Sequence, residues 1–258
     1  MRWVGVRGFQ YGILSSKTLA IIDPSLLVNL FLIEAGITEL SNDTFKDFHR
    51  LQSLQLDYNL LRHIPRNWYS ASRSGYPVDK LSISHNNITS LDAECFKNMN
   101  LTSLDLRSNA LRELRSEWFI GIENLKTLLL SGNRIKTIQP NIFRSISQLH
   151  FLDLSHNDLV CLDPGCFKIN MHHLSLLDLR SNVLREVRSA WFIGLENLRT
   201  LLLSGNKIKR VPSNAFESTI HLQFLDLSHN DLQKKEKTPL FQVNVWKHGK
   251  GLVVYTWI

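Results

Sequence analysis

The sequence predicts a repeat protein of the α/β class, a solenoid with a concave parallel β-sheet and an irregular or short-helical convex side. Three observations predict this fold. The hexamer LDLSHN ends at Asn157 and again at Asn230, and its variant LDLRSN ends at Asn109 and Asn182. Related units recur at spacings of 23 to 27 residues, and most carry a phenylalanine at one fixed place. Units of this length stack, and stacking buries apolar surface that one unit alone leaves exposed.

The repeats divide the chain into three parts. Residues 1–26 form a divergent N-terminal segment without a cysteine cap, 27–232 hold nine repeats, and 233–258 form a non-repeat tail. A complete unit reads L-x-x-L-x-L-x-x-N-x-L-x-x-L-x-x-x-x-F-x-x-L. The units start at Leu27, Leu51, Val78, Leu101, Leu125, Leu149, Leu174, Leu198 and Leu222. A longer repeat is also present: residues 101–159 and 174–232 have nearly the same sequence, offset by 73 residues, which is three repeats.

Each part of the unit predicts one structural element. The L-x-L alternation, as at Leu152 and Leu154, predicts a short strand with one buried face, so that Asp153 and Ser155 face outward. The asparagine that follows predicts a turn in which its amide satisfies backbone groups along the stack. The phenylalanines predict a second buried column on the far side of each coil, at Phe45, Phe96, Phe119, Phe143, Phe167, Phe192 and Phe216.

These units resemble the leucine-rich repeat superfamily over 27–232, and in particular its "typical" 24-residue subclass. The likeness rests on the repeat length, on the late phenylalanine and on phrases such as FIGLENLRTLLLSGNKI at 192–208. Similar repeats occur in Toll-like receptors, Slit, the acid-labile subunit and variable lymphocyte receptors. The resemblance implies a non-enzymatic module that recognises a protein or a glycan, as the ectodomain or a fragment of a cell-surface receptor, adhesion or matrix protein.

A cytosolic leucine-rich-repeat scaffold or adaptor is the competing hypothesis. The N-terminal residues make a poor secretory signal, and neither end carries the cysteine-rich caps that extracellular members usually have. These features favour either a cytoplasmic protein or a fragment of a larger receptor or matrix protein. Three N-glycosylation sequons, at Asn42, Asn87 and Asn100, favour an extracellular or cell-surface location. No apolar run reaches the length that a membrane-spanning helix needs.

The expected ligand-binding surface is the concave face of the sheet. One outward strand position is an aspartate in four units, and two arginines neighbour these carboxylates. A histidine precedes the repeated asparagine in three units, and one tyrosine supplies an aromatic anchor. The candidates are Tyr58, His85, Asp105, Arg107, Asp153, His156, Asp178, Arg180, Asp226 and His229. The alternative is a solvated polar face with cross-strand charge balance.

A second candidate surface, the basic flank, lies just past the asparagines. The residue after the second ladder leucine or isoleucine is basic in five units, at Arg62, Arg112, Lys136, Arg185 and Lys209. Because the units stack, and because the net charge is +7, this stripe favours an anionic polymer such as a glycosaminoglycan. Against this, Glu113 and Glu186 adjoin two of the arginines, and exposed loop positions often carry lysine and arginine merely for solubility. We therefore expect a protein ligand, with an anionic glycan as a second partner; nucleic acid is disfavoured, and the oligomeric state stays open.

The same register argues against catalysis and metal binding. His85, His156 and His229 lie three repeats apart, roughly 15 Å at sheet spacing, whereas Zn–N bonds are about 2 Å long. Cys95 and Cys166 are likewise too far apart for a disulfide, while Cys161 and Cys166 share a coil and are either paired or two buried thiols. Chemistry-bearing residues recur in columns and do not converge, so we expect no catalytic site, metal or cofactor.

Overall fold

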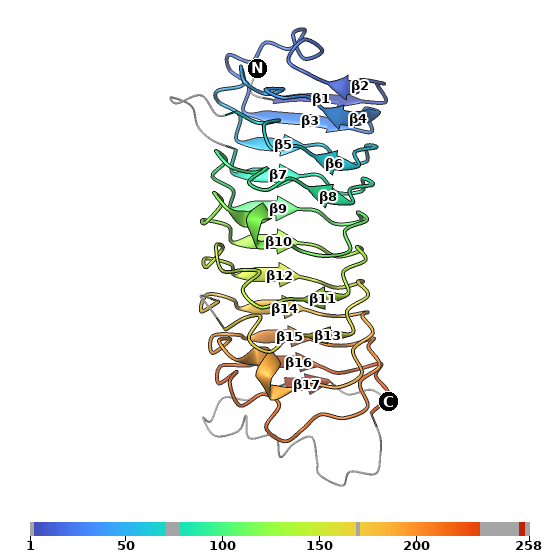
Figure 1. Ribbon diagram of the computed structural model, residues 1–258, viewed down its shortest axis with the longest axis vertical. Coiled ribbons are helices and arrows are strands. Elements are labelled where there is room, and N and C mark those ends of the chain that lie inside the picture. The colour runs from blue at the N-terminus through green and yellow to red at the C-terminus, as the bar shows by residue number, and fades with distance from the viewer. Residues whose placement is uncertain (1–2, 71–77, 169–170, 233–252, 256–258) are drawn as a thin grey trace. The chain divides into compact units, whose positions relative to one another are not determined.

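A computed structural model describes residues 3–70, 78–168, 171–232 and 253–255. The chain divides into unit 1, Met1–Leu129, and unit 2, Leu130–Ile258. In each unit, short parallel strands follow one another at one strand per coil (Figure 1). The predicted repeat-solenoid class is therefore confirmed. Most of the expected non-repeat tail, 233–252 and 256–258, lies outside the described residues.

The described residues of unit 1 form a main sheet of six parallel strands in chain order. These strands are β1 (Trp3–Arg7), β3 (Asn29–Ile33), β5 (Ser53–Gln55), β7 (Lys80–Ser82), β9 (Ser103–Asp105) and β10 (Thr127–Leu129). Two smaller sheets pair β2 (Gly12–Leu14) with β4 (Ile37–Leu40), and β6 (His63–Ile64) with β8 (Ser90–Leu91). A 3-10 helix, η1, spans Ser116–Phe119. Because β1 pairs in register with β3, the N-terminal segment adds one more coil ahead of the first predicted repeat.

Unit 2 repeats this arrangement within its described residues. Its main sheet consists of β12 (Phe151–Asp153), β14 (Leu176–Asp178), β15 (Thr200–Leu202), β16 (Phe224–Asp226) and β17 (Val253–Tyr255), all parallel. A smaller sheet pairs β11 (Thr137–Ile138) with β13 (Cys161–Leu162), and the 3-10 helix η2 spans Ser189–Phe192. The last strand, β17, continues the sheet from within the tail, in register with β16.

Two apolar columns form the core, as the repeat pattern predicts. The second residue of each repeat strand of the main sheets is a leucine in register with the leucine of its neighbour. In unit 2 these are Leu152, Leu177, Leu201 and Leu225, and all four are at most 1% exposed. The seven predicted phenylalanines are also at most 1% exposed. In unit 2, the rings of Phe143 and Phe167 stack at 5.8 Å between centroids. Each coil thus completes the core of the next.

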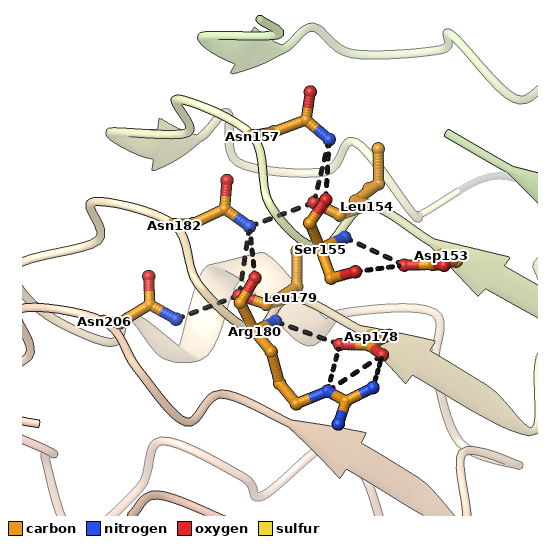
Figure 2. A network of polar contacts seen from close by, with 9 residues as sticks. All are labelled: Asp153, Leu154, Ser155, Asn157, Asp178, Leu179, Arg180, Asn182 and Asn206. Atoms are coloured by element: carbon orange, nitrogen blue, oxygen red, sulfur yellow. Dashed lines mark hydrogen bonds and ion pairs between the residues drawn. The ribbon is translucent and has the colours of Figure 1, made fainter. Parts of the chain in front are cut away.

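A ladder of asparagines fixes the turn after each strand. The Asn182 amide donates to the carbonyl oxygens of Leu154, Leu179 and Arg180 at 3.0, 3.1 and 3.2 Å, and the first of these lies one coil away (Figure 2). Its side-chain oxygen accepts a hydrogen bond from the backbone N–H of Leu159 at 3.0 Å. Equivalent bonds are made by Asn59, Asn86, Asn109, Asn157, Asn206 and Asn230. The buried backbone groups of the turn are therefore satisfied by side chains, as predicted.

The residue before each ladder asparagine adopts a left-handed backbone conformation. Its φ lies between 52° and 68° at Tyr58, His85, Ser108, Gly132, His156, Ser181, Gly205 and His229. Within the described residues, the N–H of six of these eight, all but Ser108 and His229, donates to a carbonyl of the next coil, as that of His156 does to Arg180 at 2.9 Å. Non-glycine residues adopt this conformation at a cost of roughly 1–2 kcal/mol. The glycines at two of these positions carry the signal for it in the sequence.

Candidate functional site

The outward side of the main sheet, here called the sheet face, has a hollow in unit 1. The hollow measures about 440 Å³ and is lined by residues of β5, β7 and β9 and of the turns that follow them. At its rim, the rings of Tyr58 and His85 stack with centroids 4.2 Å apart and planes 5° from parallel. Tyr58 is 52% exposed. Two of the predicted ligand-binding residues are thus brought together from neighbouring coils into one aromatic platform.

A carboxylate that the sequence analysis did not single out organises the centre of this hollow. One oxygen of Asp57 accepts hydrogen bonds from the Ser82 hydroxyl at 2.5 Å and from the backbone N–H and hydroxyl of Ser84 at 2.7 and 3.0 Å. The sequence could have indicated this residue, because Asp57 occupies the same repeat position as the candidates Arg107 and Arg180, two residues before a ladder asparagine. Beside it, Lys80 is exposed and forms no ion pair with any residue that the structure describes.

Two of the four predicted aspartates do not face solvent as expected. In unit 1, the Arg107 guanidinium donates to both carboxylate oxygens of Asp105 at 2.6 to 3.0 Å, and the Asp105 side chain is only 12% exposed. In unit 2, Arg180 covers Asp178 in the same way, leaving its side chain 4% exposed (Figure 2). The arginine two residues later folds back onto each carboxylate and covers it, so these two aspartates are not solvated; their assignment to ligand binding stays a prediction.

The other two aspartates, Asp153 and Asp226, lie on the sheet face of unit 2 and are partly exposed. The hydroxyl of Ser155 donates to Asp153 at 2.7 Å, and that of Ser228 donates to Asp226 at 2.7 Å. Burial raises the pKa of Asp226, but the hydrogen bonds from Ser228 and Ser204 and the charge of Arg180 together outweigh it and hold the pKa below its ordinary value. Ser155, predicted to face outward, is only 4% exposed because it bends back to this carboxylate.

Arg180 is the cation of this surface. Its hydrogen bond to Asp178 raises its pKa, and the charges of Asp153 and Asp226 add to the effect. The guanidinium therefore lies among three carboxylates from three coils. This arrangement holds the Arg180 side chain in place. The three carboxylates and the one guanidinium together carry a net negative charge on the sheet face of unit 2.

The two predicted histidines of unit 2 are separate from one another. His156 and His229 of unit 2 follow β12 and β16, with β14 and β15 between these strands, and both are exposed. Among the described residues, no group of three or more histidine, cysteine, aspartate or glutamate side chains is placed to hold a metal ion. Cys95, Cys161 and Cys166 are free thiols. Burial raises the pKa of the Cys166 thiol to about 12, so this thiol is inert and structural.

The basic flank is exposed in both units. Unit 1 carries Arg62 and Arg112, and unit 2 carries Lys136, Arg185 and Lys209; all five are exposed, and none forms an ion pair with a described residue. Glu113 and Glu186, which adjoin two of these arginines, pair instead with Arg115 and Arg188. In unit 2, the backbone N–H of Lys209 donates to the carbonyl of Arg185 at 3.0 Å, which fixes the two residues on neighbouring coils.

The three sequon asparagines, Asn42, Asn87 and Asn100, are all exposed. Asn87 lies directly after a ladder asparagine, beside the basic flank of unit 1, and its backbone N–H donates to Leu61 at 2.9 Å. Asn100 accepts a hydrogen bond from the Asn124 amide at 2.7 Å. Each of these three asparagines is therefore accessible for glycosylation in the folded chain.

Comparison with known proteins identifies the repeats. The family model described as "Leucine rich repeat" matches residues 77–135, 99–159 and 172–232. Lumican of Homo sapiens is 30% identical over 221 residues, which is 85% of this chain and 55% of lumican. Lumican of Bos taurus is 29% identical over 85% of this chain and 54% of its own length. The chain spans about half the length of the curated relatives it matches.

Solved structures show the same fold. A chain of the Drosophila Toll–Spatzle complex superposes with a TM-score of 0.82 at 24% identity, over 99% of this chain and 35% of that one. A chain of the TLR13–ssRNA13 complex gives a TM-score of 0.66 at 24% identity, over 88% and 40%. A chain of the complex of Latrophilin 3, Unc5D and FLRT2 (LRR) gives 0.72 at 20% identity, over 89% and 68%.

The repeat pattern, the parallel sheet and the asparagine ladder define a repeat module of the recognition class. The matched residues cover more than half of the chain, and the chain belongs to the leucine-rich repeat family. The predicted likeness to the repeats of Toll-like receptors is confirmed. Within the described residues, no helix has the length and apolar character needed to cross a bilayer.

Proposed function

We propose that this chain is the recognition part of a larger extracellular or cell-surface protein, and that its sheet face binds a protein partner without catalysis. The observation that carries the proposal is the hollow of unit 1 with its stacked Tyr58 and His85 at the rim. Aromatic side chains that are half exposed and held in place are the usual anchors of protein interfaces. The strands and the asparagine ladder hold this surface rigid, so that little conformational entropy is lost on binding.

The test uses the full chain, secreted from cultured cells and arrayed against a panel of extracellular protein domains. For the strongest partner, replacing both Tyr58 and His85 with serine should weaken binding by about 30-fold, the effect of losing one anchor of a typical interface. The matched control is Leu60→Ser, because Leu60 is 50% exposed in the same coil but lies past the ladder asparagine. Binding that survives the double variant, or that is lost equally in Leu60→Ser, would refute the sheet-face proposal.

The same secreted material separates the extracellular reading from a cytosolic scaffold. Peptide mapping of the purified chain should find N-glycans on the exposed Asn42, Asn87 and Asn100. A secreted chain with none of the three asparagines occupied would count against the extracellular part of the proposal, and would leave the binding result to be judged on its own.

A second candidate function is binding of an anionic glycan by the basic flank, and it rests on the absence of ion pairs at these five cations within the described residues. Reversing the charge of Lys136, Arg185 and Lys209 in unit 2 should weaken binding to immobilised heparin by roughly ten-fold at 0.15 M salt. The control reverses three exposed, unpaired cations elsewhere in unit 2, at Arg144, Lys168 and Arg199, and changes the net charge equally. Equal losses in the two variants would mean that net charge, and not the flank, binds heparin.

A further inference from the structure

The sheet face of unit 2 carries a row of apolar residues at outward positions. The first residue of each strand is in register with the next, so that Phe151, Leu176, Thr200 and Phe224 form one row across β12, β14, β15 and β16. Phe151 and Leu176 are partly exposed even though the buried leucine column already supplies the core of these coils. Outward positions of a sheet that faces water are normally polar. This row therefore adds apolar surface that the core does not require.

A row of opposite character runs beside the apolar one. The third residues of the same strands are Asp153, Asp178, Leu202 and Asp226, also in register. Arg180 donates to both oxygens of Asp178, whereas among the described residues Asp153 and Asp226 accept hydrogen bonds from serines and interact with Arg180 through charge alone. These three carboxylates and one guanidinium of unit 2 together carry about two net negative charges, in a chain whose net charge is +7.

The corresponding positions of unit 1 differ in both rows. From β5 to β10 its first row reads Ser53, Lys80, Ser103 and Thr127, and its second row reads Gln55, Ser82, Asp105 and Leu129. The first row is polar over these four strands and includes a cation, and among the described strands its one large apolar residue is Trp3 at the far end, on β1. Since the repeats are otherwise alike, the fold does not demand the apolar and acidic pair of rows in unit 2.

We propose that the sheet face of unit 2 binds a basic amphipathic segment of the protein partner, with its apolar side chains on the Phe151–Leu176 row and its lysines or arginines at Asp153 and Asp226. The proposal rests on the proposed function, because it names the partner chemistry of the same sheet face. Adjacent rows on a strand are two residues apart, roughly 6.6 Å, a distance that the stem of a lysine or arginine spans while its head group stays near water. Charge complementarity then selects the partner and its orientation.

Fluorescence anisotropy with a labelled 12-residue peptide of three Leu-Leu-Lys-Lys repeats, which in extended form place leucine and lysine two residues apart on each face, tests this proposal on the full chain. We expect this peptide to bind at least ten-fold more tightly than a lysine–serine peptide or a leucine–glutamate peptide of the same length. The double variant Asp153→Asn with Asp226→Asn should weaken binding at least ten-fold, and so should Phe151→Thr with Leu176→Thr. Asparagine keeps the oxygen that accepts from the serines, and thermal unfolding of each variant verifies that it is folded.

Matched controls lie in the same unit but past the ladder asparagines. Asp158→Asn with Asp231→Asn changes the charge equally, and Val160→Thr with Ile220→Thr removes apolar groups that are even more exposed than Phe151 and Leu176; neither pair should alter binding. Equal binding of the three peptides, no binding, or equal losses in the controls would each overturn the inference. A separate outcome distinguishes this inference from the proposed function. If a captured partner no longer binds the Tyr58 and His85 double variant but binds the Asp153 and Asp226 double variant normally, the proposed function stands and this inference is rejected.

Discussion

Replacing Asn182 with alanine should lower the free energy of unfolding by about 3–5 kcal/mol. Asn182 is 4% exposed, and its amide and carbonyl together bond four backbone groups of two neighbouring coils. Alanine leaves the buried N–H of Leu159 without a partner, which costs roughly 1–3 kcal/mol. It also removes three amide-to-carbonyl bonds, each worth about 0.5–1.5 kcal/mol, although each carbonyl keeps another donor, as Leu154 keeps the Asn157 amide at 3.1 Å. Urea titration followed by circular dichroism measures the change.

Asn197→Ala is the matched control for the ladder. Asn197 is exposed in the same repeat, and its amide makes one hydrogen bond, to the carbonyl of His172 at 2.7 Å. Its loss should cost at most about 1 kcal/mol, because water replaces the lost partner. If Asn182→Ala were as mild as this control, the ladder would not be the element that fixes the turns.

Gly194→Ala should destabilise the protein by about 3 kcal/mol or more. Gly194 is buried with a φ of +94°, where an L side chain is strained, and an added Cβ would lie 2.5 Å from the carbonyl oxygen of Phe167 and 2.9 Å from the Cα of Lys168. Both atoms are backbone of the preceding coil, so no side chain can turn aside to relieve the contact. Thermal unfolding should show a lower Tm than the parent chain.

Gly165→Ala separates the two contributions to this effect. Gly165 also has a positive φ, +78°, but an added Cβ would meet only the side chain of Lys168, at 3.6 Å. Its substitution should therefore cost only the conformational strain, about 1–2 kcal/mol. Equal losses at Gly165 and Gly194 would show that the close approach of coils at Gly194 does not contribute.

The strand positions could be predicted from the sequence because alternation and repeat length both specify them. Leucines at fixed spacing place Leu152, Leu177 and Leu201 in one buried column, and the structure has them in register. The N-terminal coil was missed because Val4 and Val6 replace the leucines of the pattern and no ladder asparagine follows them. Backbone pairing of β1 with β3 nevertheless continues the stack there.

The sequence predicts which candidate residues share a row of the sheet, but not which contacts their side chains make. Stacking identifies which residues share a row, but it does not reveal which side chains bond their own neighbours. Arg107 and Arg180 fold back onto the aspartates two residues before them, and these contacts depend on rotamers that spacing leaves undefined. The stacking of Tyr58 on His85, between neighbouring coils, likewise depends on side-chain rotamers. The assignment of these residues to ligand binding stays a prediction.

Hydroxyl-radical footprinting of the chain with its captured partner tests the central claim, that the sheet face is the binding surface. The method compares the oxidation of exposed side chains in the free and bound protein. The account predicts that the partner protects Tyr58 and His85 in unit 1 and Phe151 in unit 2, while Leu60 and Val160, which are about half exposed past the ladder asparagines, keep their free rates. Protection of Leu60 and Val160 with unchanged oxidation of Tyr58, His85 and Phe151 would contradict it.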